Sequence, residues 1–270
     1  MLIYIESYKF TVPKLKKLFL LFFLLNTAHA FELRYCYEAE SLYPFTNVIG
    51  AEKDRNGVFF DILSAVTKEL DIKLVGYRSS WSRCKTDLKS GKADIIAVVI
   101  WTPERDKWAV FPKTEGIVDQ SKSIWEAIYR VHTKKGSDLI WSGSSFNKSN
   151  ARIGAPSGYV AYAKLDQLGV LPDKNLKAAQ AFKLISRERL DGYVLEEVIG
   201  QNIAINNNLV EEIQTIEKPF MTSSWFAPVS RKFYKENPEL SEKIFSHLAE
   251  YRRKNQGTLL KKYLGNKAKE

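Results

Sequence analysis

Hydrophobic and polar positions in the first half of the chain predict alternating strands and helices. Strands are expected over Leu33 to Glu38 and Ile72 to Tyr77, each a short apolar run with β-branched or aromatic residues. Between them, apolar residues recur at helical spacing, at Phe59, Ile62, Leu63, Val66 and Leu70. A second helix and a third strand follow. The order strand, helix, strand, helix, strand favours a parallel sheet in an α/β fold.

The second helix and third strand lead to the clearest candidate for chemistry. Trp81 to Lys89 has helical spacing, and Gly91 is placed to end that helix. Ile95 to Ile100 is an unbroken apolar run, typical of a strand covered on both faces. A polar turn, Trp101 to Arg105, comes directly after it. Ligands of open α/β sheets gather at the carboxyl ends of strands, and an arginine there offers a fork of donors for a carboxylate or phosphate.

The second half of the chain predicts two more long strands and a further α/β unit. Ser123 to Arg130 alternates like a long strand, Thr133 to Asn150 is loop-rich, and a second unit begins at Arg152. We expect helices over Tyr159 to Leu168, Ala178 to Ser186, Glu239 to Arg253 and Thr258 to Leu264, with strands over Gly192 to Leu195 and within Glu217 to Val229.

The first thirty residues are interpreted as a secretory signal peptide. Lys14, Lys16 and Lys17 precede Leu18 to Leu25, an apolar run too short to span a bilayer. Ala28 to Ala30 then provides the small residues that a signal peptidase reads, so we expect cleavage after Ala30. The alternative is an uncleaved membrane anchor. We expect a soluble periplasmic protein and, because small residues do not precede Cys36, not a lipoprotein.

Composition and charge exclude several classes. The chain has 270 residues, 45% hydrophobic and 27% charged, enough for one large domain or two modest lobes. The net charge of +10 becomes +7 without residues 1–30, which hold four lysines and one glutamate. A basic surface suits acidic solutes or an anionic membrane, or it is only a solubilising excess of lysine.

No basic stripe with aromatics, nucleophile elbow, metal motif or phosphate loop is present, so we expect no nucleic acid, metal or cofactor.

Several motifs in this order resemble a known family. "SGKAD", the apolar strand and "TPER" are followed by an aromatic-rich segment that ends in Phe-Pro. "GVFFDILSAVTKELDIKL" precedes them, and "RLDGYVLEE" and "GTLLKKYL" come later. Together they are similar to the family 3 solute-binding proteins of ABC importers, the polar amino-acid type. The resemblance covers nearly all of the chain after residue 30.

The resemblance implies a type II periplasmic-binding-protein-like fold, with two α/β lobes joined by two crossing hinge strands and a ligand cleft between them. Residues 31–120 and 221–270 would form a discontinuous first lobe, and residues 121–220 the second lobe. Such a protein closes on its ligand, because the ligand contacts both lobes.

In the first lobe, the resemblance assigns Arg105 to the α-carboxylate of an amino acid. The alternative is a surface arginine paired with a neighbouring acid. Thr102 could donate a hydroxyl to the same anion, or it could only shape the turn. Trp81 and Trp101 could form aromatic walls, or they could pack in the core and over the strand end. Glu38, at the end of the first strand, could also face the cleft.

In the second lobe, Ser157, Gly158 and Tyr159 stand at the head of a helix, where backbone N–H groups could bind an anion. An ordinary helix start is the alternative. Glu196 matches the position of a family aspartate that pairs with the ligand's amino group, or it only caps a helix. Cys36 and Cys84 would lie at the same end of the first lobe, which favours a disulfide over two buried thiols.

The chain also departs from the family pattern. Ala97, Val98 and Ile100 stand where small or hydroxyl residues are usual, and Tyr159 and Val160 stand where a threonine is usual. The ligand could therefore be an organic anion, a modified amino acid or something larger.

We expect a monomeric, non-enzymatic binding protein that carries a small polar or anionic solute to an ABC permease in the inner membrane. One alternative is a periplasmic enzyme on the same scaffold, similar to cyclohexadienyl dehydratase, with Glu38 or Glu196 as its acid or base. Another is a ligand-sensing partner of a membrane receptor.

Overall fold

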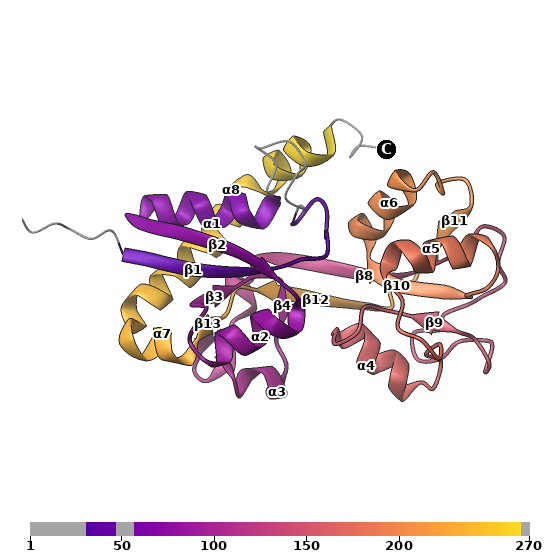
Figure 1. Ribbon diagram of the computed structural model, residues 1–270, viewed down its shortest axis with the longest axis horizontal. Coiled ribbons are helices and arrows are strands. Elements are labelled where there is room, and N and C mark those ends of the chain that lie inside the picture. The colour runs from indigo at the N-terminus through magenta and orange to yellow at the C-terminus, as the bar shows by residue number, and fades with distance from the viewer. Residues whose placement is uncertain (1–30, 47–56, 266–270) are drawn as a thin grey trace, which may run out of the picture.

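Two β-sheets, joined by two long strands, organise the chain (Figure 1). The structure is a computed structural model that describes residues 31–46 and 57–265. The predicted signal peptide, residues 1–30, lies outside the described residues. Among the described helices, none combines the length and apolar character that a bilayer crossing requires.

The first sheet has the order β2-β1-β3-β13-β5 and belongs to what we call the first lobe. Its strands are β1 (Phe31–Glu38), β2 (Ile72–Ser79), β3 (Ile95–Ile96), β5 (Ala109–Val110) and β13 (Val229–Ser230). β1 pairs in parallel with both β2 and β3, which confirms the predicted parallel sheet. The helices of this lobe are α1 (Val58–Glu69), α2 (Trp81–Lys89), α3 (Pro103–Asp106), α7 (Arg231–Glu236) and α8 (Pro238–Leu264).

The second sheet has the order β4-β12-β8-β10-β9, with β11 paired to β8, and extends into the second lobe. Its strands are β4 (Val99–Ile100), β8 (Trp125–Lys134), β9 (Ile153–Gly154), β10 (Gly192–Glu196), β11 (Ile213–Thr215) and β12 (Met221–Phe226). The helices of the second lobe are α4 (Val160–Gln167), α5 (Ala178–Ser186) and α6 (Glu197–Asn206). A hairpin of β6 (Lys113–Thr114) and β7 (Ile117–Val118) and a 3₁₀ turn at Gln120–Lys122 lead into β8.

The long strands β8 and β12 connect the lobes, as the fold prediction required. They pair antiparallel from Met221 opposite Tyr129 to Trp225 opposite Trp125, and Figure 1 shows both running from one lobe to the other. The start of β8 and the end of β12 are anchored together in aromatic packing. The ring of Phe45 lies 4.8 Å from that of Trp125 and 5.1 Å from that of Trp225, centroid to centroid. Edge-to-face pairs of this kind stabilise a core beyond their buried area.

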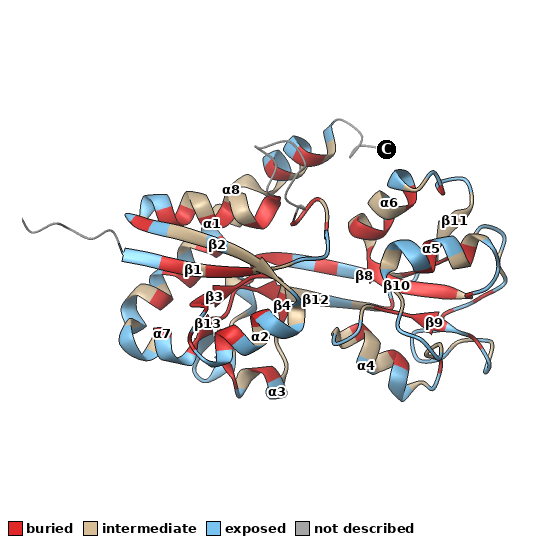
Figure 2. Ribbon diagram, viewed as in Figure 1, coloured by how far each residue is buried: buried red, intermediate tan, exposed pale blue. Residues whose placement is uncertain are grey.

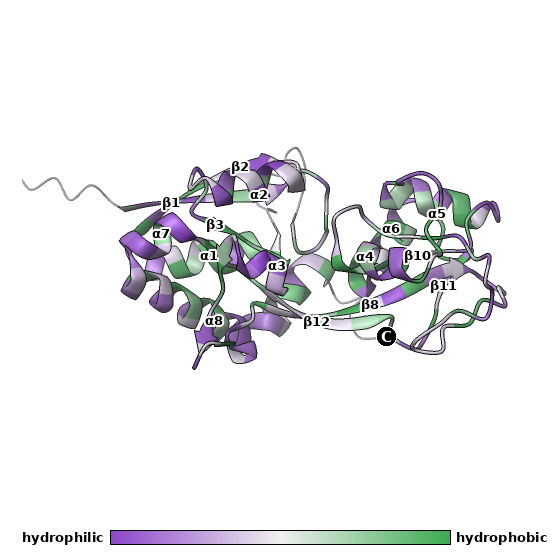
Figure 3. Cartoon of the chain, turned by 90° about the horizontal axis from the view of Figure 1, so that it is seen from below, coloured by the Kyte–Doolittle hydropathy of each residue, from purple (hydrophilic) through white to green (hydrophobic). Residues whose placement is uncertain are grey.

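The distribution of buried and of polar residues agrees with this two-lobe arrangement. Buried residues concentrate on the sheets and on the helix faces toward them (Figure 2). Polar residues cover much of the outer surface of the helices (Figure 3). The shared face of β8 and β12 is thus part of a continuous apolar core that reaches from the first lobe into the second.

The predicted strand Ile95 to Ile100 is divided in the structure. β3 belongs to the first sheet and β4 to the second, and Val98 between them has a φ of 66°. A positive φ is costly for a β-branched residue, on the order of 1–3 kcal/mol. The turn at Val98 moves the chain from one sheet to the other, so that Arg105 follows the edge of the second sheet.

The two predicted C-terminal helices are one helix, α8, so the expected break between Arg253 and Thr258 was wrong. Gly257 lies inside this helix with open space around its Cα, and a single glycine weakens a helix by only about 1 kcal/mol. Packing of α8 against α1 outweighs that cost.

Two helical glycines give a matched prediction. A Cβ at Gly200 in α6 would lie 2.0 Å from Nε2 of the buried His132, whereas a Cβ at Gly257 would meet nothing within 4 Å. Gly200→Ala should therefore lower the free energy of unfolding by about 1–3 kcal/mol. Gly257→Ala should raise it by about 0.5–1 kcal/mol. Urea unfolding of both variants measures this, and equal changes of the same sign would contradict the packing at His132.

Candidate functional site

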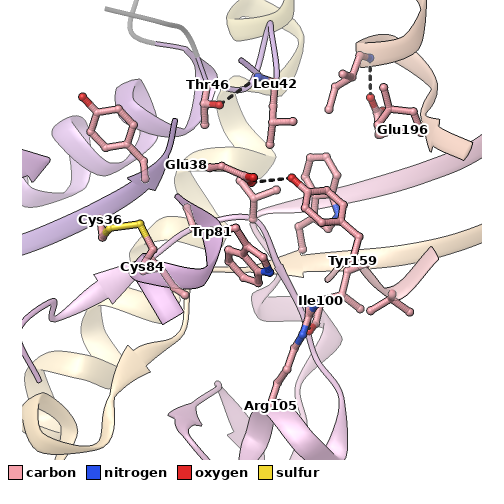
Figure 4. Close-up of a pocket in the computed structure, with 18 of the residues that line it drawn as sticks. Cys36, Glu38, Leu42, Thr46, Trp81, Cys84, Ile100, Arg105, Tyr159 and Glu196 are labelled. Carbon is pink, nitrogen blue, oxygen red and sulfur yellow. Dashed lines mark hydrogen bonds between the residues drawn. A yellow bond between two sulfur atoms is a disulfide. The ribbon is translucent and has the colours of Figure 1, made fainter. Parts of the chain in front are cut away.

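A small pocket lies where the two lobes meet, and we call it the inner pocket (Figure 4). β1, α2 and α3 supply Glu38, Trp81 and Arg105 to its wall, and the second lobe supplies Tyr159 and Glu196. Side chains fill most of the space and leave a cavity of about 30 Å³. That is far below the roughly 300–1,000 Å³ of typical ligand pockets, so a ligand of that size requires side chains or lobes to move.

Arg105 lines this pocket from the first lobe. Thr102 begins α3, and its hydroxyl accepts a hydrogen bond of 3.1 Å from the Arg105 backbone N–H. The Arg105 side chain is buried, with 8% of the residue exposed. Its Nη1 donates to the Ile100 carbonyl at 3.0 Å, and its Nη2 donates to the Gly158 carbonyl at 3.2 Å, across the interface between the lobes. Burial lowers the pKa of Arg105, yet a guanidinium keeps its charge in proteins.

Arg105 has no carboxylate partner within ion-pair distance among the described residues. The neighbouring Asp106 pairs instead with Lys113 at 2.6 Å, so the alternative of a surface pair does not describe this arginine. A buried charge without an opposite charge is unfavourable, and two carbonyl groups compensate only part of the lost hydration. The geometry thus favours an anion at Arg105.

Trp81 forms a wall of the same pocket. Its ring centroid lies 5.4 Å from Cζ of Arg105, within the range of a cation–π contact. Its indole Nε1 is buried and has no hydrogen-bond partner in residues 31–46 and 57–265. A ligand oxygen near Arg105 could accept that bond.

Two predicted site residues of the first lobe lie outside the inner pocket. Neither Trp101 nor Thr102 lines the inner pocket, contrary to expectation. The hydroxyl of Thr102 is engaged at the start of α3, because a hydroxyl at this position satisfies a free backbone N–H of the helix. Trp101 packs beside a satellite cluster of the first lobe that includes Trp108 and Phe111.

The predicted disulfide between Cys36 and Cys84 is present and borders the pocket (Figure 4). Cys36 is two residues before Glu38, on the same face of β1, because side chains alternate along a strand. Cys84 is one helical turn after Trp81, on the same face of α2. The bond therefore fixes the strand that carries Glu38 to the helix that carries Trp81.

Tyr159 closes the pocket from the second lobe. Its hydroxyl donates a hydrogen bond of 2.6 Å to Oε2 of Glu38, and its ring lies 6.4 Å from that of Trp81. Burial raises the pKa of the Glu38 carboxyl. Gly158 has a φ of 80°, a conformation that favours glycine, and this turn directs its carbonyl at Arg105. An acceptor, and not the expected backbone donor, thus faces the arginine, while Ser157 is exposed and lies outside the inner pocket.

Glu196 caps a helix, which is one of the two roles that the sequence left open, and it also lines the inner pocket. It is the last residue of β10 and the N-cap of α6, and its Oε2 accepts a 2.9 Å bond from the Ile199 backbone N–H. Glu196 also lines the inner pocket and is 3% exposed. Burial, the largest effect, raises its pKa to about 8. The carboxyl therefore holds a proton at neutral pH unless a cation approaches it.

Sequence reasoning missed the pocket residues of the crossing strands. Tyr129 on β8 and Trp225 on β12 line the pocket, and Trp225 Nε1 donates to the Tyr129 hydroxyl at 3.0 Å. The alternating pattern of β8 places Tyr129 on the buried face with Trp125 and Ala127, so it could have identified Tyr129. Among the described residues, no group of three or more His, Cys, Asp or Glu side chains could hold a metal ion.

Comparisons with known proteins agree with this architecture. The family model for bacterial extracellular solute-binding proteins, family 3, matches residues 33–266. Among curated proteins, none matches the chain significantly.

Solved structures share the fold. An ancestral arginine-binding protein bound to glutamine has a TM-score of 0.68 at 22% identity, covering 87% of this chain and 98% of that one. A histidine kinase sensor domain with similarity to periplasmic binding proteins has a TM-score of 0.69 at 16% identity, covering 87% and 96%. A substrate-binding protein of an ABC uptake transporter from Streptococcus pneumoniae with bound histidine has a TM-score of 0.65 at 18% identity, covering 87% and 93%.

The disulfide predicts a stability change that extends to the site. It closes a loop of 48 residues, so a variant with both Cys36→Ala and Cys84→Ala should lose about 4 kcal/mol of unfolding free energy in the chain-entropy account. Urea denaturation of the oxidised protein and the variant measures the loss. A loss below about 1 kcal/mol would contradict the chain-entropy account for this bond.

The raised pKa of Glu196 predicts a pH-dependent stability difference. Between its ordinary pKa of 4.5 and about 8, the folded protein keeps the proton and the unfolded chain releases it, so stability falls as pH rises. The glutamine of Glu196→Gln does not titrate. The free energy of unfolding of this variant, relative to that of the wild type, should therefore rise by more than about 1 kcal/mol between pH 5 and pH 8. Urea unfolding at both pH values tests this, with Glu217→Gln, on an exposed residue, as the control. If the difference in unfolding free energy between Glu196→Gln and the wild type were the same at both pH values, Glu196 would lie in a solvated environment.

Proposed function

Because the chain belongs to the bacterial extracellular solute-binding proteins, family 3, we propose that it closes on a small carboxylate-bearing solute, an amino acid or a related compound, for an ABC importer. The single observation that carries the proposal is the buried Arg105 guanidinium, which faces the junction of the lobes without a carboxylate partner among the described residues. The fold and the family support a ligand-binding protein outside the cytoplasm.

The contacts of Arg105 support a carboxylate as the recognised group. Its two carbonyl partners leave other guanidinium N–H donors free for an anion. The unpartnered Trp81 Nε1 provides a further donor beside it. Charge-assisted hydrogen bonds to a carboxylate are about twice as strong as neutral ones. A carboxylate therefore binds to these donors more strongly than a water molecule does.

Glu196 supports a ligand that also carries an ammonium group. A cation near this buried carboxyl lowers its pKa, and the resulting carboxylate pairs with that cation. Two of the similar structures hold bound glutamine and bound histidine, both amino acids. Arg105 and Glu196 come from different lobes, so an amino acid that contacts both would stabilise the closed arrangement.

The partner is inferred from relatives and from the sequence. The ABC uptake protein among the similar structures supports delivery to a permease in the inner membrane. The kinase sensor domain supports the alternative of a sensing role for the same closure. The signal peptide predicted over residues 1–30 agrees with a periplasmic site of action, and we propose a monomer.

A second candidate, an enzyme on the same scaffold, is favoured by one observation. A carboxyl with a pKa of about 8 keeps its proton at neutral pH and could act as a general acid toward a bound carboxylic acid. Glu38 would be the companion base. Turnover of a candidate substrate that survives both Glu196→Gln and Glu38→Gln would eliminate this mechanism.

Arg105→Ala tests the proposal directly. A thermal-shift screen of the protein without residues 1–30 first identifies a carboxylate ligand, and calorimetry then measures affinity in both proteins. Loss of one partner of a buried charge pair costs at least about 2 kcal/mol, so affinity should fall by about thirtyfold or more.

Arg187→Ala is the matched control, because Arg187 is an exposed arginine of the second lobe outside the inner pocket. It should leave the affinity unchanged. An Arg105→Ala protein that binds the ligand within about threefold of the wild type would contradict a carboxylate contact at this position.

A further inference from the structure

A second and larger pocket adjoins the inner pocket, and we call it the outer pocket. It lies between the turn after β1, around Ser41 to Tyr43, and the helices α5 and α6 of the second lobe. Its cavity measures about 500 Å³, within the range of pockets that hold drug-sized ligands. The inner cavity of about 30 Å³ is far smaller.

The two pockets share one wall. Five residues border both of them, namely Glu38, Leu42, Tyr159, Leu195 and Ile199. The hydrogen bond from the Tyr159 hydroxyl to Glu38, a dashed line in Figure 4, joins two residues of this shared wall. Rotation of the Tyr159 side chain would break one bond and join the two spaces. It would also expose the Glu38 carboxylate as an acceptor.

The lining of the outer pocket is rich in carboxamides. Five residues carry one, namely Asn175, Gln180, Asn202, Asn206 and Asn207. Asn202 and Asn207 each donate through Nδ2 to a carbonyl one turn earlier in α6, at 2.8 Å and 2.9 Å. Those bonds fix the side chains and leave the amide oxygens able to accept from a ligand.

The rest of the lining is mixed. Leu42, Tyr43 and Leu176 provide apolar surface, and the ion pair of Glu40 with Lys177, at 2.6 Å, bridges the two lobes at this pocket. Both side chains of that pair are more than half exposed, so the pair is weak and easily replaced. Glu38 and Glu40 together offer negative charge to a ligand ammonium.

We propose that the inner and outer pockets form one site for a short peptide of two or three residues. The carboxylate of the peptide binds Arg105 and the indole N–H of Trp81. Its amide groups lie along the carboxamides of α6 and the start of α5, and its ammonium group lies toward Glu38 or Glu40. The inference rests on the proposed function for the carboxylate and adds the class of ligand.

Three features together carry this assignment. The inner cavity is too small for an amino acid beside Tyr159, whereas the outer cavity has space for several residues. Carboxamides donate and accept at the same time, as peptide groups do, so the two match in hydrogen bonding. Arg105, which can bind an anion, lies at one end of the combined site. The carboxylates Glu38 and Glu40, which can bind an ammonium group, line the outer pocket.

The test uses the protein without residues 1–30 and two ligand pools at equal total concentration, the twenty amino acids and a tripeptide library. Ala179→Phe fills the outer pocket, and Asn202→Leu removes one of its carboxamides. Ala163→Phe is the matched control, since Ala163 is exposed on α4 and lines neither pocket. Each variant is first melted in buffer to verify that it folds.

The tripeptide pool should raise the melting temperature of the wild type and of Ala163→Phe more than the amino-acid pool does. The shift should fall by more than half in Ala179→Phe and in Asn202→Leu. A peptide shift that survives in both variants overturns the inference, as does the absence of any peptide shift.

Failure of this inference is distinguishable from failure of the proposed function. An amino-acid shift that requires Arg105 but is unchanged by Ala179→Phe retains the proposed function and overturns the peptide assignment alone. A peptide shift that is lost in Ala179→Phe but unchanged in Arg105→Ala overturns the carboxylate contact on which both depend. An oligosaccharide pool that shifts the melting temperature more than the peptides do overturns the peptide class.

Discussion

The buried positive charge of Arg105 is the constraint on which the rest of this site depends. A guanidinium removed from water needs an opposite charge or several strong acceptors. The chain supplies two carbonyl oxygens, one from Ile100 beside it and one from Gly158 in the other lobe. The second of these bonds joins the lobes through the same group that an anionic ligand would bind. In the proposed function, recognition of the anion and closure of the lobes are therefore parts of one interaction.

The chain's own side chains accomplish much of the closure. Tyr159 from the second lobe bonds Glu38 of the first, and the disulfide holds β1 and α2, the elements that carry Glu38 and Trp81, together. The Tyr159 ring lines both pockets and fills the space between them, which explains why the inner cavity is small and why the larger space lies behind Tyr159.

Sequence patterns predicted most of the fold, since hydrophobic periodicity is a local property. The bounds of α2 and α5 agree with the predicted helices, and Arg105, Trp81, Glu38, Tyr159 and Glu196 all reach one pocket. The division of the strand at Val98 could not be predicted, because tertiary packing imposes a positive φ on a β-branched residue. Thr102 and Trp101 follow the same strand as Arg105. Their side chains are directed by the short helix α3 and by the satellite cluster, which sequence spacing does not report.

A crystal structure of the protein with a bound ligand, identified by thermal shift, would show whether Arg105 binds a carboxylate. The decisive quantity is the distance from the Arg105 guanidinium nitrogens to the nearest ligand oxygen. We expect a carboxylate oxygen at about 2.7–2.9 Å, the length of a charge-assisted hydrogen bond. A ligand bound elsewhere, with Arg105 bonded only to the carbonyls of Ile100 and Gly158, would contradict it.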